Sequence, residues 1–93
     1  MAMTRDETTR ALRAARRYVD LCDAYRATSA AHDIVLGRIE AGLRRRAASM
    51  PPELLTERMG VVAERRLNAR QTHATFVTRR LQALSRLDEL GGG

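Results

Sequence analysis

Residues 52–90 read PELLTERMGVVAERRLNARQTHATFVTRRLQALSRLDEL, and this stretch decides the fold. Starting at Leu55, mostly apolar residues recur in alternating steps of four and three, the heptad pattern of a helix that packs along one seam. The series is Leu55, Met59, Val62, Arg66, Ala69, His73, Phe76, Arg80, Ala83, Leu87 and Leu90. A helix over 52–90 would be about 57 Å long at 1.5 Å per residue, which predicts a rod rather than part of a compact domain.

A second stripe runs beside this seam on the same predicted helix. It contains Ala63, Leu67, Arg70, Ala74, Val77, Leu81 and Leu84. Two adjacent stripes make a wide apolar face, which needs cover from two directions. We therefore predict that a partner packs on the apolar members of the second stripe, which are Leu67, Ala74, Val77, Leu81 and Leu84.

The part of the chain before residue 52 predicts a second long helix. Thr4 and Glu7 match the capping box that begins a helix, and the prolines at 51 and 52 end it, because a residue before proline leaves the α region. The expected inner stripe of this helix is Leu12, Ala15, Val19, Cys22, Tyr25, Ser29, His32, Leu36, Ile39 and Leu43. The prediction is one domain over 1–93, with helices over 4–48 and 52–90, a turn at 49–51 and a disordered tail at 91–93.

So short a connection makes the two helices antiparallel. The predicted fold is therefore all-α: a long antiparallel helical hairpin, or coiled coil, that completes a three- or four-helix bundle by self-association or with a partner. The composition agrees with close helix packing, since the apolar share of 44% includes one Phe, two Tyr and no Trp.

The charge of the chain narrows the classes of partner. All 17 basic residues are Arg, and the net charge is +6. The planar guanidinium group binds carboxylates and phosphates through paired hydrogen bonds, so an acidic protein or a nucleic acid is the expected partner. Nucleic acid ranks below protein, because few aromatic residues are present to stack on bases. The predicted binding residues for an acidic surface are Arg10, Arg13, Arg17, Arg65, Arg70, Arg79 and Arg86.

The sequence predicts no catalytic, cofactor or metal site. His32 and His73 both fall on the predicted inner stripes, but they lack the further ligands that a metal requires, so we interpret them as packing residues. Arg66 and Arg80 are expected to pack their stems in the seam and to reach Glu40 or Asp20 with their guanidinium groups.

The single cysteine, Cys22, is interpreted as a small buried residue, and it favours a reducing compartment over a disulfide framework. No apolar run approaches the roughly 20 residues of a membrane span, and no signal-peptide pattern begins the chain. The expectation is a soluble cytoplasmic protein that does not enter a membrane.

Three short segments resemble the tubulin-binding cofactor A family. They are Arg16-Arg17-Tyr18-Val19 followed by Tyr25, Pro52-Glu53-Leu54, and Val61-Val62-Ala63-Glu64-Arg65-Arg66, with Leu81 and Leu87 at later heptad positions. The resemblance covers about residues 9–87. Two features depart from the family pattern: residues 67–73 contain no proline, and the chain stops where the family's third helix begins.

The resemblance implies a non-enzymatic chaperone that binds β-tubulin during tubulin folding and microtubule biogenesis. A basic rod suits the acidic tails of tubulins. Two other functions remain open. One is a coiled-coil subunit of a hetero-oligomeric complex, as in the snapin-like proteins, for which the open stripe matters more than the charge. The other is a basic nucleic-acid-binding protein.

Overall fold

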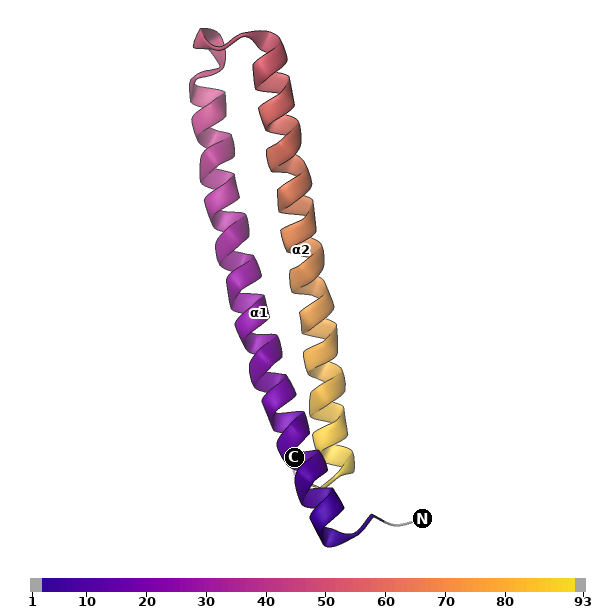
Figure 1. Ribbon diagram of the computed structural model, residues 1–93. Helices are drawn as coiled ribbons and strands as arrows, with labels where there is room; N and C mark the ends of the chain where they lie inside the picture. The colour runs from indigo at the N-terminus through magenta and orange to yellow at the C-terminus, as the bar shows by residue number, and fades with distance from the viewer. Residues whose placement is uncertain (1–2, 92–93) are drawn as a thin grey trace.

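The protein is a two-helix hairpin, as the sequence predicts (Figure 1). The computed structural model describes residues 3–91, and its helices are α1 (Arg5–Arg45), the short 3-10 helix η1 (Ala47–Ser49) and α2 (Pro52–Glu89). The two long helices lie antiparallel along the whole molecule, which measures 67 × 18 × 15 Å. The prediction of an all-α antiparallel hairpin is confirmed.

Local chemistry explains where α1 begins and ends. The Thr4 hydroxyl accepts a hydrogen bond from the Glu7 amide at 3.1 Å, and Asp6 and Glu7 lie at the positive end of the helix dipole. The helix ends at Arg45, three residues before the predicted boundary at 48. There the chain tightens into η1, and Met50 then becomes extended because Pro51 follows it.

The second helix begins at Pro52, as predicted, and ends one residue before the predicted position 90. Gly91 follows with φ +78°, a left-handed conformation in which a side chain would be strained, and its amide donates to the Asp88 carbonyl at 3.0 Å. The remainder of the predicted tail, 92–93, lies outside the described residues.

The predicted seam of α2 is confirmed over its whole length, since each of its heptad positions is buried or half-buried. In the half of the hairpin near the turn, Leu36, Leu43 and Val62 form a buried cluster. Met50, Leu55 and Met59 pack against this cluster. Farther from the turn, the small buried residues Cys22 and Ala83 share the seam with the larger residues Phe76 and Leu87.

The predicted inner stripe of α1 is wrong at three positions. Tyr25, His32 and Ile39 are exposed, and each following residue, namely Arg26, Asp33 and Glu40, lies half-buried in the seam instead. With that change the steps of three and four continue without interruption from Leu12 to Met50. Charged residues occupy these inner positions because α2 and the flank of α1 supply oppositely charged partners for them.

The register of the hairpin agrees with a fold at about Met50. The rings of Tyr25 and Phe76 stack with their centroids 4.6 Å apart, and Arg80 meets Asp23 across the seam. In residues 3–91, neither long helix combines the length and the apolar character that crossing a membrane requires.

Candidate protein-binding surfaces

A cluster of ion pairs crosses the seam in the half of the hairpin near the turn. Asp33 and Glu40 lie one heptad apart on α1, and Arg66 of α2 lies between them. The Arg66 Nε donates to Asp33 Oδ1 at 2.8 Å, and its Nη1 donates to Glu40 Oε2 at 2.8 Å. Arg70 also reaches Asp33, at 3.3 Å, and Arg44 reaches Glu40, at 2.6 Å.

These contacts shift the protonation equilibria of the cluster. The hydrogen bonds from Arg66 lower the pKa of Asp33 and the pKa of Glu40, although partial burial opposes both shifts. In turn, the two carboxylates raise the pKa of Arg66. At neutral pH all three groups are therefore charged, and the guanidinium group of Arg66 is occupied within the hairpin.

A second cluster lies nearer the chain ends. The Arg80 Nε donates to Asp23 Oδ1 at 2.7 Å, and Arg26 Nη1 donates to the same oxygen at 3.0 Å. The 2.8 Å contact of Arg66 with Glu40, in the first cluster, confirms the predicted pairing of these two residues. The predicted partner Asp20 is wrong for Arg80, because Asp23 lies directly beside the seam whereas Asp20 points farther out.

One side of the hairpin carries a surface that we call the leucine face. It consists of Leu67, Ala74, Val77, Leu81 and Leu84 of α2, together with Ile34 of α1. Leu67 is 56% exposed, Leu81 is 61% exposed and Ile34 is 57% exposed, whereas Val77 and Leu84 are half-buried. The second stripe thus remains largely open beside α1. Sequence reasoning missed Ile34, because the expected stripe of α1 passed through His32 rather than Asp33.

The opposite side carries a surface that we call the arginine face. Its basic members recur at multiples of seven along α2, directly beside the seam: Arg58, Arg65, Arg79 and Arg86. Tyr18, Tyr25 and Ile39 occupy the corresponding edge of α1. The guanidinium carbon of Arg79 lies 5.3 Å from the centre of the Phe76 ring, a cation–π distance.

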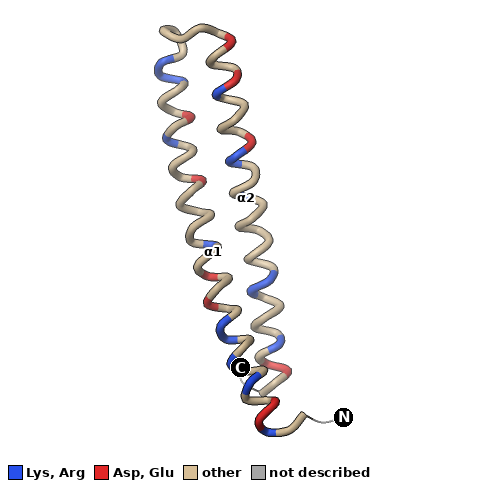
Figure 2. The backbone as a smooth tube through the Cα atoms, in the orientation of Figure 1, with Lys and Arg blue, Asp and Glu red and all other residues tan. Residues whose placement is uncertain are grey.

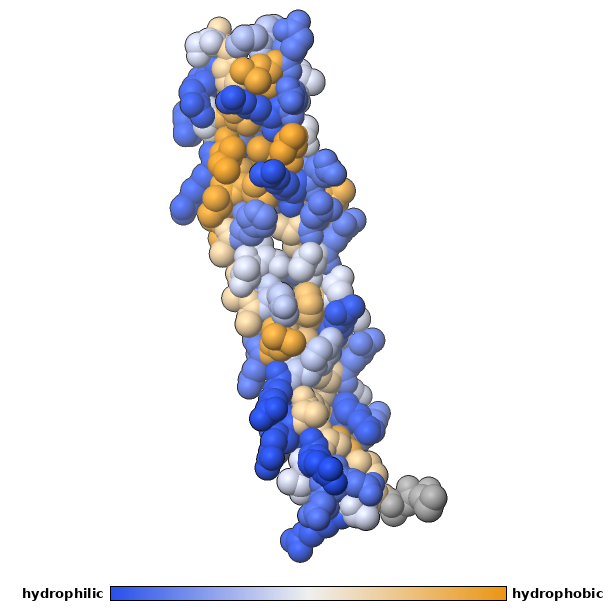
Figure 3. Space-filling model, in the orientation of Figure 1, coloured by the Kyte–Doolittle hydropathy of each residue, from blue (hydrophilic) through white to orange (hydrophobic). Residues whose placement is uncertain are grey.

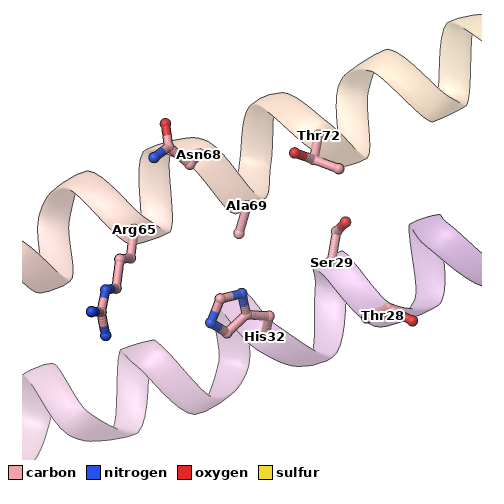
Figure 4. A pocket seen from close by; sticks show the side chains of 7 residues that line it. All are labelled: Thr28, Ser29, His32, Arg65, Asn68, Ala69 and Thr72. Carbon is pink, nitrogen blue, oxygen red and sulfur yellow. The ribbon is translucent and has the colours of Figure 1, made fainter.

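The arginine face contains two hollows. The central hollow, of about 510 Å³, opens where the small residues Ser29 and Ala69 occupy the seam, and Figure 4 shows His32 and Arg65 reaching toward it from opposite helices. Its other lining residues are Thr28, Asn68 and Thr72. The turn-side hollow, of about 270 Å³, is lined by Ile39, Leu43, Arg46, Glu57, Arg58, Val61 and Val62.

Figure 3 views the middle of the hairpin from this side. Apolar side chains gather over both helices near the turn, and a hollow among paler side chains lies below them. The arginine face therefore changes along its length, from a hollow with an apolar floor near the turn to a hollow bordered by polar side chains at mid-length.

The seven arginines predicted to bind an acidic surface do not form one patch. Arg65, Arg79 and Arg86 lie on the arginine face, whereas Arg70 lies on the other side of α2. Exposed positions of α1 away from the seam hold Arg10, Arg13 and Arg17. Two members of the set already have carboxylate partners, since Arg70 pairs with Asp33 and Arg86 with Glu89. Basic residues follow both helices, interspersed with acidic ones (Figure 2).

The histidines and the cysteine are separated. His73 is half-buried in the seam as predicted, whereas His32 is exposed on the arginine face, so the two do not share a seam position. Cys22 is fully buried with a free thiol. Within the described part of the chain, no group of three His, Cys, Asp or Glu residues is placed to hold a metal ion.

Comparisons with family models, with curated proteins and with solved structures find no match to this chain. The segments that resemble the tubulin-binding cofactor A family lie on different parts of the hairpin. In α1, Arg17 and Tyr18 are exposed and Val19 is half-buried, and in α2, Val62 belongs to the buried cluster.

Proposed function

We propose that the protein is a non-enzymatic interaction protein whose two helices complete a larger helical bundle with a protein partner. The open leucine face is the observation that supports this proposal. Leu67 and Leu81 expose more than half of their surface on the same side as Ile34. A third helix laid along this side would remove those side chains from water, which is favourable by about 25 cal/mol per Å² of apolar surface.

The charge of the chain supports an acidic partner. The chain carries +6, and Arg10, Arg13 and Arg17 form no ion pair among the described residues. The resemblance to tubulin-binding cofactor A names β-tubulin, a cytoplasmic protein with an acidic tail, as the specific partner. On this proposal, the leucine face takes the place where the third helix of that family packs.

The experiment compares two double variants by sedimentation, each alone and mixed with purified tubulin. Leu67→Ser with Leu81→Ser makes the leucine face polar, whereas Gln71→Ser with Thr78→Ser changes exposed positions that are already polar. The wild type and the second variant should form a complex with tubulin, and the first variant should not. Equal complex formation by both variants would count against the leucine face as the binding surface. If wild-type protein does not bind tubulin, the specific partner is wrong.

The leucine face also favours a second function, that of a coiled-coil subunit in a hetero-oligomeric complex of helical hairpins. In that case the exposed apolar side chains would be covered by another helical subunit rather than by tubulin. Solubility separates the two proposals: a subunit of this kind should remain soluble only with its partner subunit, whereas a tubulin chaperone should be soluble by itself.

A further inference from the structure

We infer that the arginine face binds an amphipathic helix that carries acidic residues along one edge. The inference rests on the proposed function, since it names the form of an acidic partner and the surface that receives it. It does not use the leucine face, which lies on the other side of the hairpin.

The arrangement of charge is the first reason. Arg58 and Arg65 form no ion pair among the described residues, and their side of α2 continues with Arg79 and Arg86. The opposite edge of the face, on the α1 side, holds Tyr18, Tyr25, His32, Ile39 and Arg46 and, among the described residues, no carboxylate. An incoming helix therefore meets guanidinium groups along one edge and, apart from His32 and Arg46, aromatic or apolar side chains along the other. Acidic residues spaced by about seven would lie opposite the arginines.

The hollows are the second reason, because they set the spacing of the side chains that enter them. The turn-side hollow is centred near Leu43 and Val62, and the central hollow lies at Ser29 and Ala69. These centres are two heptads apart on α1 and one heptad apart on α2, so the hollows are roughly 10–20 Å apart. A bound helix spans that distance in about 11 residues, or three turns, and so presents both side chains on one face.

The lining of each hollow indicates what enters it. Ile39, Leu43 and Val62 give the turn-side hollow an apolar floor, which suits a Leu, Ile or Met side chain. The central hollow is bordered by hydroxyl, imidazole, amide and guanidinium groups and suits a Glu, Asp or Gln side chain.

A nucleic acid is a poorer fit to this surface than a helix. The rings of Tyr25 and Phe76 stack on each other, so each has one face already covered, and bases would have few open rings on which to stack. Arg46 and Arg58 border the turn-side hollow and could contact a phosphate, but its apolar floor of Ile39, Leu43 and Val62 suits an apolar side chain rather than a phosphate backbone.

The experiment measures binding of a fluorescein-labelled helical peptide by anisotropy at about 150 mM salt, where weak long-range attraction is screened. The peptide has three heptads with leucines along one face and glutamates along its edge, and a second peptide has lysines in place of the glutamates. Arg58→Glu with Arg65→Glu changes the arginine face. Arg38→Glu with Arg45→Glu makes the same change of charge at exposed positions on the outer side of α1.

We expect the glutamate peptide to bind the wild type and the lysine peptide not to bind. The change on the arginine face should weaken binding by about tenfold, and the matched change by about twofold, because only the first removes direct pairs and adds repulsion. Arg58→Gln with Arg65→Gln repeats the test without added repulsion near Glu57, and circular dichroism checks that this variant stays helical. It should still weaken binding several-fold more than Arg38→Gln with Arg45→Gln.

Three results would overturn the inference. The first is an equal loss in both charge-reversed variants, which would mean attraction to net charge alone. The second is tighter binding of a single-stranded oligonucleotide that the Arg58 and Arg65 variant abolishes. The third is loss of the glutamate peptide in Leu67→Ser with Leu81→Ser but not in the arginine variants. That third result would place the acidic helix on the leucine face and leave the proposed function standing.

Discussion

Truncating one buried and one exposed leucine tests how the hairpin distributes its packing energy. Leu36 is 3% exposed in the cluster near the turn, and Leu81 is 61% exposed on the leucine face. Replacing a leucine by alanine removes three carbon groups, each worth about 0.8 kcal/mol when buried. Leu36→Ala should therefore lower the free energy of unfolding by about 2.5–3 kcal/mol, including a small cavity term. Leu81→Ala should lower it by about 1 kcal/mol, because only about two fifths of the residue is covered.

The assay is urea unfolding followed by circular dichroism at low and high protein concentration. In a dilute sample the two losses should differ by about 1.5–2 kcal/mol, with an unchanged dependence on urea. If a second copy covers the leucine face at high concentration, the loss for Leu81→Ala should grow while the loss for Leu36→Ala stays nearly constant. Equal losses in the dilute sample would refute the assignment of Leu36 to the core and of Leu81 to the surface.

Three further predictions concern the seam and the helices. Because Arg66 lowers the pKa of Asp33 and Glu40, the contribution of these carboxylates to stability is present at neutral pH and is lost as the pH falls to about 4 and below. In urea titrations at several pH values, the Asp33→Asn, Glu40→Gln variant should lose much of this acid sensitivity, and an unchanged pH profile would contradict the pairing. Gly60→Ala should stabilise the protein by about 0.5–1 kcal/mol, since the added Cβ meets open space. Gly37→Ala should stabilise it less, because the added Cβ would lie 3.4 Å from the Arg66 guanidinium group. An equal gain in stability for the two variants in thermal unfolding would mean that this contact is unimportant. Thr4→Ala removes a cap worth about 1 kcal/mol to the first turn, so the Glu7 amide should exchange faster with solvent while amides in the middle of α1 keep their rates.

The seam of α2 was predictable from sequence because its positions recur in unbroken steps of four and three from Leu55 to Leu90, although a second stripe runs beside it. The seam of α1 was only partly predictable. At three places a more apolar residue, such as Tyr25 or Ile39, stands immediately before the charged residue that lies inside, and hydropathy alone favours the wrong member. Arg26 pairs with Asp23 on its own helix, but at Asp33 and Glu40 the deciding interactions come from Arg66, which is distant in sequence. A pattern read along one helix does not contain them.

The candidate surfaces were predictable to a similar degree. The exposed leucines of α2 follow directly from its second stripe, whereas Ile34 joins them only when the register of α1 is corrected. Arginine counts indicated a basic rod but did not divide the arginines between its sides. That division depends on the angular position of each side chain around the helix axis, measured from the seam. The central hollow depends on two small residues, Ser29 and Ala69, meeting across the hairpin.

The position of Arg66 between Asp33 and Glu40 has a consequence for alignment. Sliding α2 by one heptad in one direction would place Arg66 beside Arg26, and sliding it in the other would leave it next to Ala47 with a single carboxylate. Only one offset therefore satisfies the charges. The same offset holds when α2 comes from another molecule, so two opened chains that exchange this arm rebuild identical contacts and differ from the hairpin only in the connection at residues 46–51.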